Sequence, residues 1–538
     1  MIKKKLYMIW FIGLISVAAG FKIWLIFSDL VPFNSDEAIV GLMARHILRG
    51  DWPVFFYGQA YMGSLEASLV AAAFTLFGPQ VWVIRLVQTI LYLLLIISTV
   101  FIGRLFFGSQ RAGLIAGSLL AIPTVNLTLY TTASLGGYGV ALLMGNLLLI
   151  TSWKGVYCES INSQSFRKFI TMIGFGFFAG FGLWANGLTL VYSIPCFLFI
   201  LYHIVRTHSL KQTARFGFAI FIGIVIGTIP LWGFGLQNGL SAMVGELMGQ
   251  AVAVGTGPFL QQVSIHLGNY LLFGTTVLFG LRPPWDIIWL GLPFIPFVLM
   301  LWGIVMVHWV RVNLNPDPWR PGFALLFGVL AVFTAGFLLT PFGIDPSGRY
   351  FLPLGICIAI VGGAMFDRWI KFQPKAWAAI IFLLGFHIWG NLESAMKIPP
   401  GFTTQFYAPA RVDMGYMDEL ISFLEDKHEI RGYTNYWVSY PLAFISQEKI
   451  IFTPRLPYHP DLRYTPRDNR YYPYHRLVED SQQIAYITTH NPNLDSRLIE
   501  ALTRMEISWK EERIGDFVVY YDLSLPMRPS EIEFSLDQ

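Results

Sequence analysis

Apolar runs of about 17–25 residues recur along the chain before residue 395, and short polar connections separate them. Each run is long enough to cross roughly 30 Å of hydrocarbon as a helix. Only 13% of the residues are charged, whereas soluble domains carry about 25%. The sequence therefore predicts a polytopic α-helical membrane protein of about 11 transmembrane helices. We expect the spans at 7–27, 81–103, 112–130, 136–153, 169–184, 188–205, 217–235, 287–310, 323–340, 350–366 and 376–394.

The basic residues give an expected orientation. Lys3, Lys4 and Lys5 precede the first span, and most other Lys and Arg residues of the connections fall on the same side of the predicted topology. The opposite connections before the last span hold Arg45, Arg49, Arg85, Arg282 and Arg349. By the positive-inside rule, the N-terminus is cytoplasmic and an odd number of spans places the C-terminal region outside. We expect an uncleaved anchor in a bacterial inner membrane.

Three regions are longer than simple connectors. Residues 28–80 form a first external loop, and residues 236–286 form a second. The second contains an amphiphilic stretch, Leu271 to Leu281, which is too short to span and is expected in the interface or a groove. The remaining polar tail, residues 395–538, is long enough for one small domain. We therefore divide the chain into a transmembrane domain, residues 1–394, and an extracytoplasmic α/β domain, residues 395–538.

Local patterns in the tail predict a small α/β domain. Apolar spacing indicates a helix over Met414 to Lys427 and another around Leu494 to Met505. Short apolar runs indicate strands at Lys449 to Thr453, Ile484 to Thr488 and Asp516 to Tyr521.

Carboxylates gather in the first external loop. Asp36 and Glu37 follow the first span directly, and Glu66 lies before a second apolar helix in the same loop. Acids at a membrane surface are costly unless they are paired or used. Asp36 is equally well explained as a cap for a helix that starts at Glu37, and Glu66 as a helix-start acid.

The whole loop is more specific than any one acid. Its ordered pieces are Asp36-Glu37, the Ala44-Arg45 helix, Gly50-Asp51-Trp52-Pro53, and Gly58 with Tyr61, and a further motif is Gly348-Arg349-Tyr350-Phe351-Leu352-Pro353. In order and spacing, these pieces resemble the GT-C glycosyltransferases, especially glycosyltransferase family 39 with its ArnT-like and protein O-mannosyltransferase-like groups. The resemblance implies a GT-C-like fold and inverting transfer of a sugar from a polyprenyl-phosphate donor.

One departure limits what the resemblance implies. ArnT-like loops commonly carry an acid beside Lys-Pro just after the tyrosine, whereas Tyr61 is followed here by Met-Gly-Ser-Leu-Glu66. No particular sugar follows, and the acceptor is a glycan, a lipid or a protein.

The resemblance also implies roles for the acids. Asp36 is the first candidate for a general base that takes the acceptor proton, and such a base contributes about 10²–10⁴-fold. Glu37 and Glu66 are second candidates. Asp36 and Glu37 would also suit a divalent cation, although two acids alone do not establish one.

The leaving lipid phosphate needs positive charge rather than a proton donor. Arg349 is the first candidate because a guanidinium can grip phosphate with two donors, and Arg85, Arg282 and Lys22 are reserves. The alternatives are a snorkelling role for Arg349 and an interface anchor for Arg85. Tyr61, Tyr350 and His266 are candidate substrate-binding residues.

Two other functions fit the same composition. A transporter or flippase of lipid-linked glycans would need polar or broken helices in mid-membrane, and the predicted spans hold few ionisable residues. A non-catalytic envelope assembly protein would act through its tail. The net charge is +4 and no basic block indicates nucleic acid, so the expected partners are membrane lipid, the lipid-linked donor and its acceptor.

Overall fold

The computed structural model describes residues 2–157, 164–247, 257–397 and 401–532. The chain divides into two compact units. The helical unit comprises Met1–Ser28, Ala60–Glu66 and Arg85–Lys397, and the loop–tail unit comprises Asp29–Gln59, Ala67–Ile84 and Ile398–Gln538. Most of the first loop thus belongs to the same compact unit as the C-terminal region.

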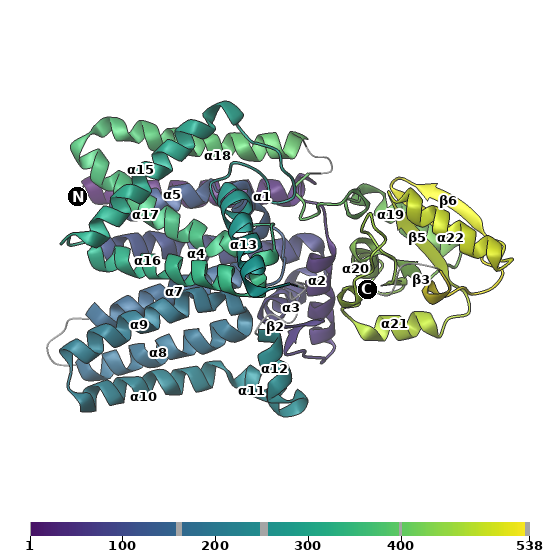
Figure 1. Cartoon of the computed structure of the whole chain (residues 1–538), viewed down its shortest axis with the longest axis horizontal. Helices are drawn as coiled ribbons and strands as arrows, with labels where there is room; N and C mark the ends of the chain where they lie inside the picture. The colour runs from purple at the N-terminus through teal and green to yellow at the C-terminus, as the bar shows by residue number, and fades with distance from the viewer. Residues whose placement is uncertain (1, 158–163, 248–256, 398–400, 533–538) are drawn as a thin grey trace. The chain divides into compact units, whose positions relative to one another are not determined.

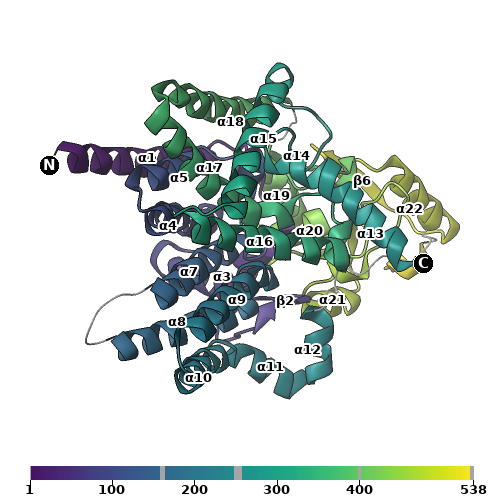
Figure 2. The ribbon, with the colours of Figure 1, turned by 60° about the vertical axis from the view of Figure 1, so that its left-hand side comes forward.

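Long apolar helices build the helical unit, as predicted. In the described part of the chain, 10 helices are long and apolar enough to cross a membrane. They are α1 (Ile2–Phe27), α4 (Val81–Phe107), α7 (Tyr138–Tyr157), α8 (Gln164–Ala185), α9 (Leu190–Thr207), α10 (Leu210–Gly227), α15 (Ile295–Leu314), α16 (Arg320–Leu339), α17 (Leu352–Phe372) and α18 (Trp377–Lys397). Figure 1 and Figure 2 show these helices side by side.

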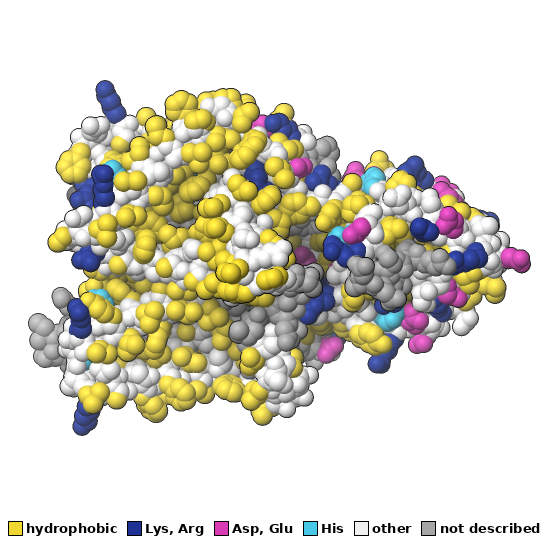
Figure 3. Space-filling view, viewed as in Figure 1, with side chains coloured by type: hydrophobic (Ala, Val, Ile, Leu, Met, Phe, Trp, Pro, Cys, Tyr) yellow, Lys and Arg dark blue, Asp and Glu magenta, His cyan; other side chains and the backbone are white. Residues whose placement is uncertain are grey.

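The surface of the helical unit matches a bilayer environment. On the face shown in Figure 3, hydrophobic side chains cover the long helices, and Lys and Arg side chains gather at the end where the N-terminus lies. The hydrocarbon core of a bilayer holds no water, so nothing there drives burial of these apolar faces, and backbone groups must pair within the protein. The helical unit is therefore that of an integral membrane protein.

The span predicted at 112–130 is wrong as a single helix. It consists of α5 (Gln110–Ala121) and α6 (Val125–Tyr130), which are separated at Pro123. At 1.5 Å per residue these pieces are roughly 18 Å and 9 Å long. Proline lacks the N–H that would continue the helix, so the break follows from the sequence.

Side chains of α18 satisfy the backbone groups that this break exposes. His387 Nδ1 contacts the carbonyl oxygen of Ile122 at 2.8 Å, and Asn391 Nδ2 donates to that of Pro123 at 2.9 Å. Neighbouring helices commonly supply such bonds, because an unpaired carbonyl in a membrane is costly.

Lys22 of α1 supports the end of α6 from another direction. Its side chain is fully buried, and Nζ donates to Thr131 Oγ1 and Thr132 Oγ1 at 2.7 Å each and to the Thr128 carbonyl at 3.1 Å. These bonds use all the protons of an ammonium group. Lys22, a reserve candidate for phosphate binding, therefore has a structural role.

The second loop is a series of short helices: α11 (Ile229–Asn238), α12 (Leu240–Leu247), α13 (Phe259–Gly268), η2 (Asn269–Gly274) and α14 (Thr275–Leu278). Residues 248–256 of this loop lie outside the described residues. The predicted span 217–235 is interrupted at Thr228, where α10 ends and α11 begins.

The loop–tail unit contains α2 (Ser35–Leu48) and a mixed sheet. The strands are β3 (Arg431–Thr434), β4 (Ile451–Pro454), β5 (Ala485–Thr489), β6 (Lys510–Ile514) and β7 (Phe517–Tyr521), in the order β4-β3-β5-β7-β6. β3 is parallel to β4 and β5, and β7 is antiparallel to β5 and β6. The predicted small α/β fold is confirmed.

Helices surround this sheet and complete its core. They are α19 (Met417–Asp426), α20 (Tyr436–Ile445), α21 (Tyr472–Glu479) and α22 (Pro492–Arg504). Leu420 of α19 and Val438 of α20 are buried with Phe452, Ile487 and Val519 of the strands. Between α2 and α4, the first loop also forms two short strands and one helix. They are β1 (Phe55–Phe56), β2 (Gln59–Gly63) and α3 (Leu65–Phe77).

The first-loop helix α2 packs closely on α20 of the tail. A Cβ at Gly41 would lie 2.5 Å from the ring of Phe444, so glycine is needed for this approach. The Arg45 guanidinium lies 4.3 Å over the same ring, and its Nη1 donates to the Phe444 carbonyl at 2.8 Å.

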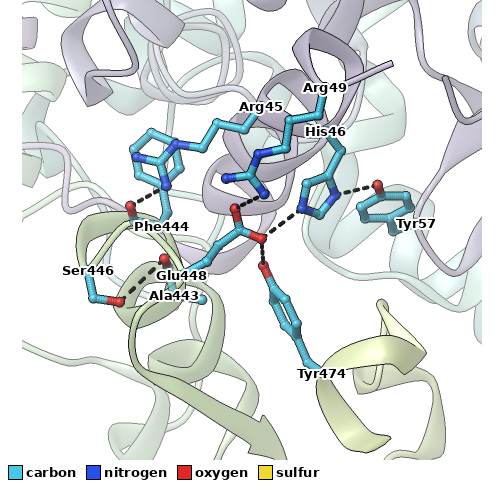
Figure 4. Close-up of polar contacts among 9 residues, drawn as sticks. All are labelled: Arg45, His46, Arg49, Tyr57, Ala443, Phe444, Ser446, Glu448 and Tyr474. Atoms are coloured by element: carbon cyan, nitrogen blue, oxygen red, sulfur yellow. Dashed lines mark hydrogen bonds and ion pairs between the residues drawn. The ribbon is translucent and has the colours of Figure 1, made fainter. Parts of the chain in front are cut away.

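A carboxylate at the centre of this contact binds α2 through several side chains (Figure 4). Glu448 Oε1 lies 2.8 Å from His46 Nε2 and accepts from the Tyr474 hydroxyl at 2.8 Å. Its other oxygen lies 2.8 Å from Arg49 Nη1, while His46 Nδ1 contacts the Tyr57 hydroxyl at 2.7 Å. Burial opposes ionisation, but the bonds from His46 and Tyr474 and the charge of Arg49 lower the pKa of Glu448 to about 2.

We predict that Glu448→Gln destabilises the loop–tail unit by about 3 kcal/mol at neutral pH, because it removes the charge that these donors surround. The pKa of Glu448 is depressed in the fold, so its contribution is complete above about pH 4.5 and is lost as the pH falls toward about 2. The measurement is the apparent unfolding temperature of the full chain in detergent across this range.

The exposed Glu425 provides a matched control, since its nearest cation, Lys449, is 3.9 Å away. Glu425→Gln should leave the unfolding profile unchanged. A Glu448→Gln variant that unfolds at the wild-type temperature at pH 7 contradicts the prediction.

Candidate active site

Asp36 lies in the first turn of α2, but another residue caps this helix. Asn34 is the N-cap, and its side chain accepts a hydrogen bond from the Glu37 backbone N–H at 3.1 Å. Glu37 is fully buried, whereas Asp36 is half-buried. Capping therefore does not explain the carboxylate of Asp36.

The tail supplies the partner of Asp36. The Tyr436 hydroxyl donates to Asp36 Oδ1 at 2.5 Å, although the two residues are 400 positions apart in the sequence. The hydroxyl of Ser35 donates to the Tyr436 backbone carbonyl, which fixes the tyrosine against the start of α2. Burial, and then the charge of Asp36, raise the pKa of Tyr436 far above its usual range, so the phenol remains a donor.

A carboxyl group of the tail also lies in electrostatic range of Asp36. Asp468 is buried, and burial raises its pKa to about 7 despite the opposing charge of Arg470, with a further rise from Asp36. The Arg470 guanidinium lies 5.6 Å from the ring centre of Tyr436. The Gln59 amide fits best with its oxygen turned toward Arg470. In that orientation the oxygen accepts from Arg470 Nη1 at 2.5 Å and from Arg470 Nη2 at 2.7 Å. Neither Tyr436 nor Asp468 was predicted from the sequence as a partner of Asp36.

Glu66, the third candidate acid, belongs to the helical unit rather than to the unit that holds Asp36 and Glu37. It is buried at the start of α3, where it accepts from Gln88 Nε2 at 2.6 Å and from the Ser134 hydroxyl. Arg85 is buried one turn before Gln88 on α4 and so lies on the same side of that helix.

Arg349 lies directly before α17, in a setting suited to an anion. Its Nη2 pairs with Asp345 Oδ2 at 2.5 Å, and its guanidinium lies 5.1 Å from the ring centre of Tyr350. Tyr138 and Tyr130 are also in its electrostatic range. Within the described ranges, the buried Nε of Arg349 makes no hydrogen bond.

Two of the predicted substrate-binding tyrosines lie close to this cation in the helical unit. Tyr61 packs against Phe342 with 6.4 Å between ring centres, and Phe342 packs against Tyr350 at 5.3 Å. Tyr138 interacts electrostatically with Tyr61, Tyr350 and Arg349. The structure thus brings Tyr61, Tyr350 and Arg349 into one tyrosine-rich site, which we call the Arg349 site.

Arg282 has contacts typical of a structural residue. Its Nε donates to Thr276 Oγ1 at 3.0 Å, and its Nη atoms donate to the carbonyls of Pro283, Asp286, Phe273 and Pro346 at 2.9–3.2 Å. A guanidinium has five N–H donors, so none remains for a phosphate.

His266 also supports the fold around the Arg349 site. It is buried, and its Nδ1 contacts the Leu338 carbonyl oxygen at 2.9 Å. The nearby Asn269 Nδ2 donates to the carbonyls of Gly343 and Ile344 at 2.9 and 3.0 Å. These contacts hold the segment that leads to Asp345 and Arg349.

In the part of the chain that the structure describes, the acids form no metal-binding cluster. Among residues 2–157, 164–247, 257–397 and 401–532, no group of three or more His, Cys, Asp or Glu residues is arranged to hold a metal ion. A divalent cation at Asp36 and Glu37 therefore stays a prediction.

Known proteins resemble this chain in structure rather than in sequence. No family model matches the chain, and no curated protein matches it by sequence. ArnT from Cupriavidus metallidurans bound to undecaprenyl phosphate has 13% identity and a TM-score of 0.57, over 95% of this chain and 98% of that one. The Archaeoglobus fulgidus oligosaccharyltransferase AglB, in complex with an inhibitory peptide and a dolichol-phosphate, has 12% identity and a TM-score of 0.51. The match covers 89% of this chain and 69% of that one. This chain therefore shares a fold with both structures, and the GT-C-like fold predicted from the sequence is confirmed.

Proposed function

We propose that this protein is a membrane glycosyltransferase that moves a sugar from a polyprenyl-phosphate donor to a glycan, lipid or protein acceptor. The observation that carries the proposal is the buried Nε–H of Arg349, which makes no hydrogen bond among the described residues. An unsatisfied buried donor costs about 1–3 kcal/mol, and a phosphate oxygen would satisfy it.

The surroundings of Arg349 support binding of a lipid phosphate. The departing phosphate is an anion, and a fixed guanidinium stabilises the charge that develops on it. Asp345 holds the guanidinium, and Tyr61, Tyr138 and Tyr350 add phenol groups for the phosphate or the sugar. The ArnT and AglB structures carry undecaprenyl phosphate and dolichol-phosphate, which supports a donor of this class.

Asp36 is the proposed general base. Its half-exposed carboxylate would take the acceptor proton as the oxygen attacks the anomeric carbon, and one displacement inverts that carbon. Glu37 and Glu66 stay second candidates.

A lipid-glycan flippase is the competing function, and the broken helix α5–α6 is its best structural argument. However, Lys22 donates hydrogen bonds to Thr131 and Thr132 directly after α6, and side chains of α18 bond the carbonyls at the break. This bonding supports a fixed kink rather than a moving gate. A non-catalytic tail protein is less well supported, because the tail contacts the candidate base.

For localisation, we propose an inner membrane with the N-terminus in the cytoplasm and the tail outside. The basic end of the helical unit in Figure 3 supports this orientation under the positive-inside rule.

Arg349→Gln is expected to weaken undecaprenyl phosphate binding by about 10- to 100-fold, because a charge-assisted hydrogen bond contributes about 1.5–3 kcal/mol. The affinity of Arg349→Lys should lie between those of the wild type and Arg349→Gln, since lysine cannot bind two oxygens in the same geometry. The measurement is a binding titration of the purified chain. Arg320→Gln, at an exposed arginine that begins α16, is the control. Wild-type affinity in Arg349→Gln refutes the donor site.

Asp36→Asn is expected to reduce sugar transfer by about 10²–10⁴-fold and to leave undecaprenyl phosphate affinity unchanged. Mass spectrometry of envelope glycans and lipids, with and without the chain, first identifies the missing product. The rate is then measured for wild type, Asp36→Asn and the control Asp51→Asn, an exposed acid of the same loop. Full activity in Asp36→Asn would exclude Asp36 as the base.

A further inference from the structure

The C-terminal domain contributes a hydrogen bond directly to the candidate base. Asp36 Oδ1 accepts from Tyr436 at 2.5 Å, and Tyr436 is itself buried at 2% exposure. A hydrogen bond to one of its oxygens restricts how the carboxylate can turn. The other oxygen, Oδ2, then has a defined direction for an incoming hydroxyl.

Several contacts fix Tyr436 independently of its bond to Asp36. Its ring packs against Trp437 at 4.8 Å and against Tyr440 at 5.5 Å between ring centres. Ser35 donates to its backbone carbonyl, and Arg470 lies over its ring. The tyrosine is thus held on both sides and is preorganised as a donor.

The charge around Asp36 is set largely by the tail. Tyr436, Tyr458 and Asp468 are in electrostatic range of Asp36. Arg470 faces both Tyr436 and Asp468, while Glu37 is the adjacent acid on α2. Groups of the tail, far from Asp36 in the sequence, therefore lie within electrostatic range of its carboxylate.

We propose that Tyr436 is a positioning residue for sugar transfer, which orients the Asp36 carboxylate, and that the C-terminal domain is thereby part of the catalytic machinery. This inference rests on the proposed role of Asp36 as base. It assigns to the tail a chemical contribution in addition to any contact with the acceptor.

The test is Tyr436→Phe in the full chain, because phenylalanine keeps the ring packing and removes only the hydroxyl. Transfer should fall by roughly 10- to 100-fold in kcat, since the bond goes to a charged group, and undecaprenyl phosphate affinity should stay unchanged. The acidic limb of the pH–rate profile should move to higher pH, because the ionised carboxylate loses a donor. A purely structural tyrosine would not shift this limb.

Tyr486→Phe is the matched control. Tyr486 is a buried tyrosine of the same unit, and its hydroxyl donates to the Met527 carbonyl at 2.5 Å, in the sheet region. Its loss should leave the pH–rate profile unchanged.

If Tyr436→Phe does not fold, 3-fluorotyrosine at position 436 keeps the hydroxyl and makes it more acidic. The stronger donor should move the acidic limb to lower pH. An unchanged limb in either form overturns the proposal.

A double-variant comparison separates this inference from the proposed function. In an Asp36→Asn background, Tyr436→Phe should cause no further loss, because its effect passes through Asp36. Losses that multiply overturn the positioning role while leaving Asp36 as the base. An Asp36→Asn variant with full activity removes the proposed base itself, whatever Tyr436→Phe does.

Discussion

The contact between helix α2 of the first loop and helix α20 of the tail is the interaction on which the loop–tail unit depends. Glu448 binds His46, which lies 402 residues earlier in the sequence, and Tyr436 binds Asp36 in the same way. Gly41 permits the close approach, because any Cβ there would collide with Phe444. The contact that joins α2 to the tail therefore also positions the candidate base.

The helical unit follows a different logic, set by the absence of water in the bilayer. Every backbone group freed by the break at Pro123 must find a partner, and His387 and Asn391 provide two of these bonds. Lys22 and Arg282 use their donors within the fold, whereas the buried Nε–H of Arg349 makes no hydrogen bond among the described residues. This N–H is the donor that we propose for the lipid phosphate.

Hydropathy predicted most of the helical unit, because a long apolar run has few alternatives to a spanning helix. It failed at α5–α6, where the sequence stays apolar through Pro123 and the break is invisible to composition. In the tail, β6 was missed because Lys510–Ile514 is an exposed, charged edge strand without apolar alternation. Tyr436 and Asp468 were missed as partners of Asp36 because nothing local in a single sequence pairs residues so far apart.

The proposed function depends on Arg349 binding the phosphate of a lipid-linked donor. An experimental structure of the full chain with bound undecaprenyl phosphate is the sharpest test. We expect a phosphate oxygen within about 3 Å of Arg349 Nε. A phosphate bound at another cation, with no contact to Arg349, refutes the proposed donor site.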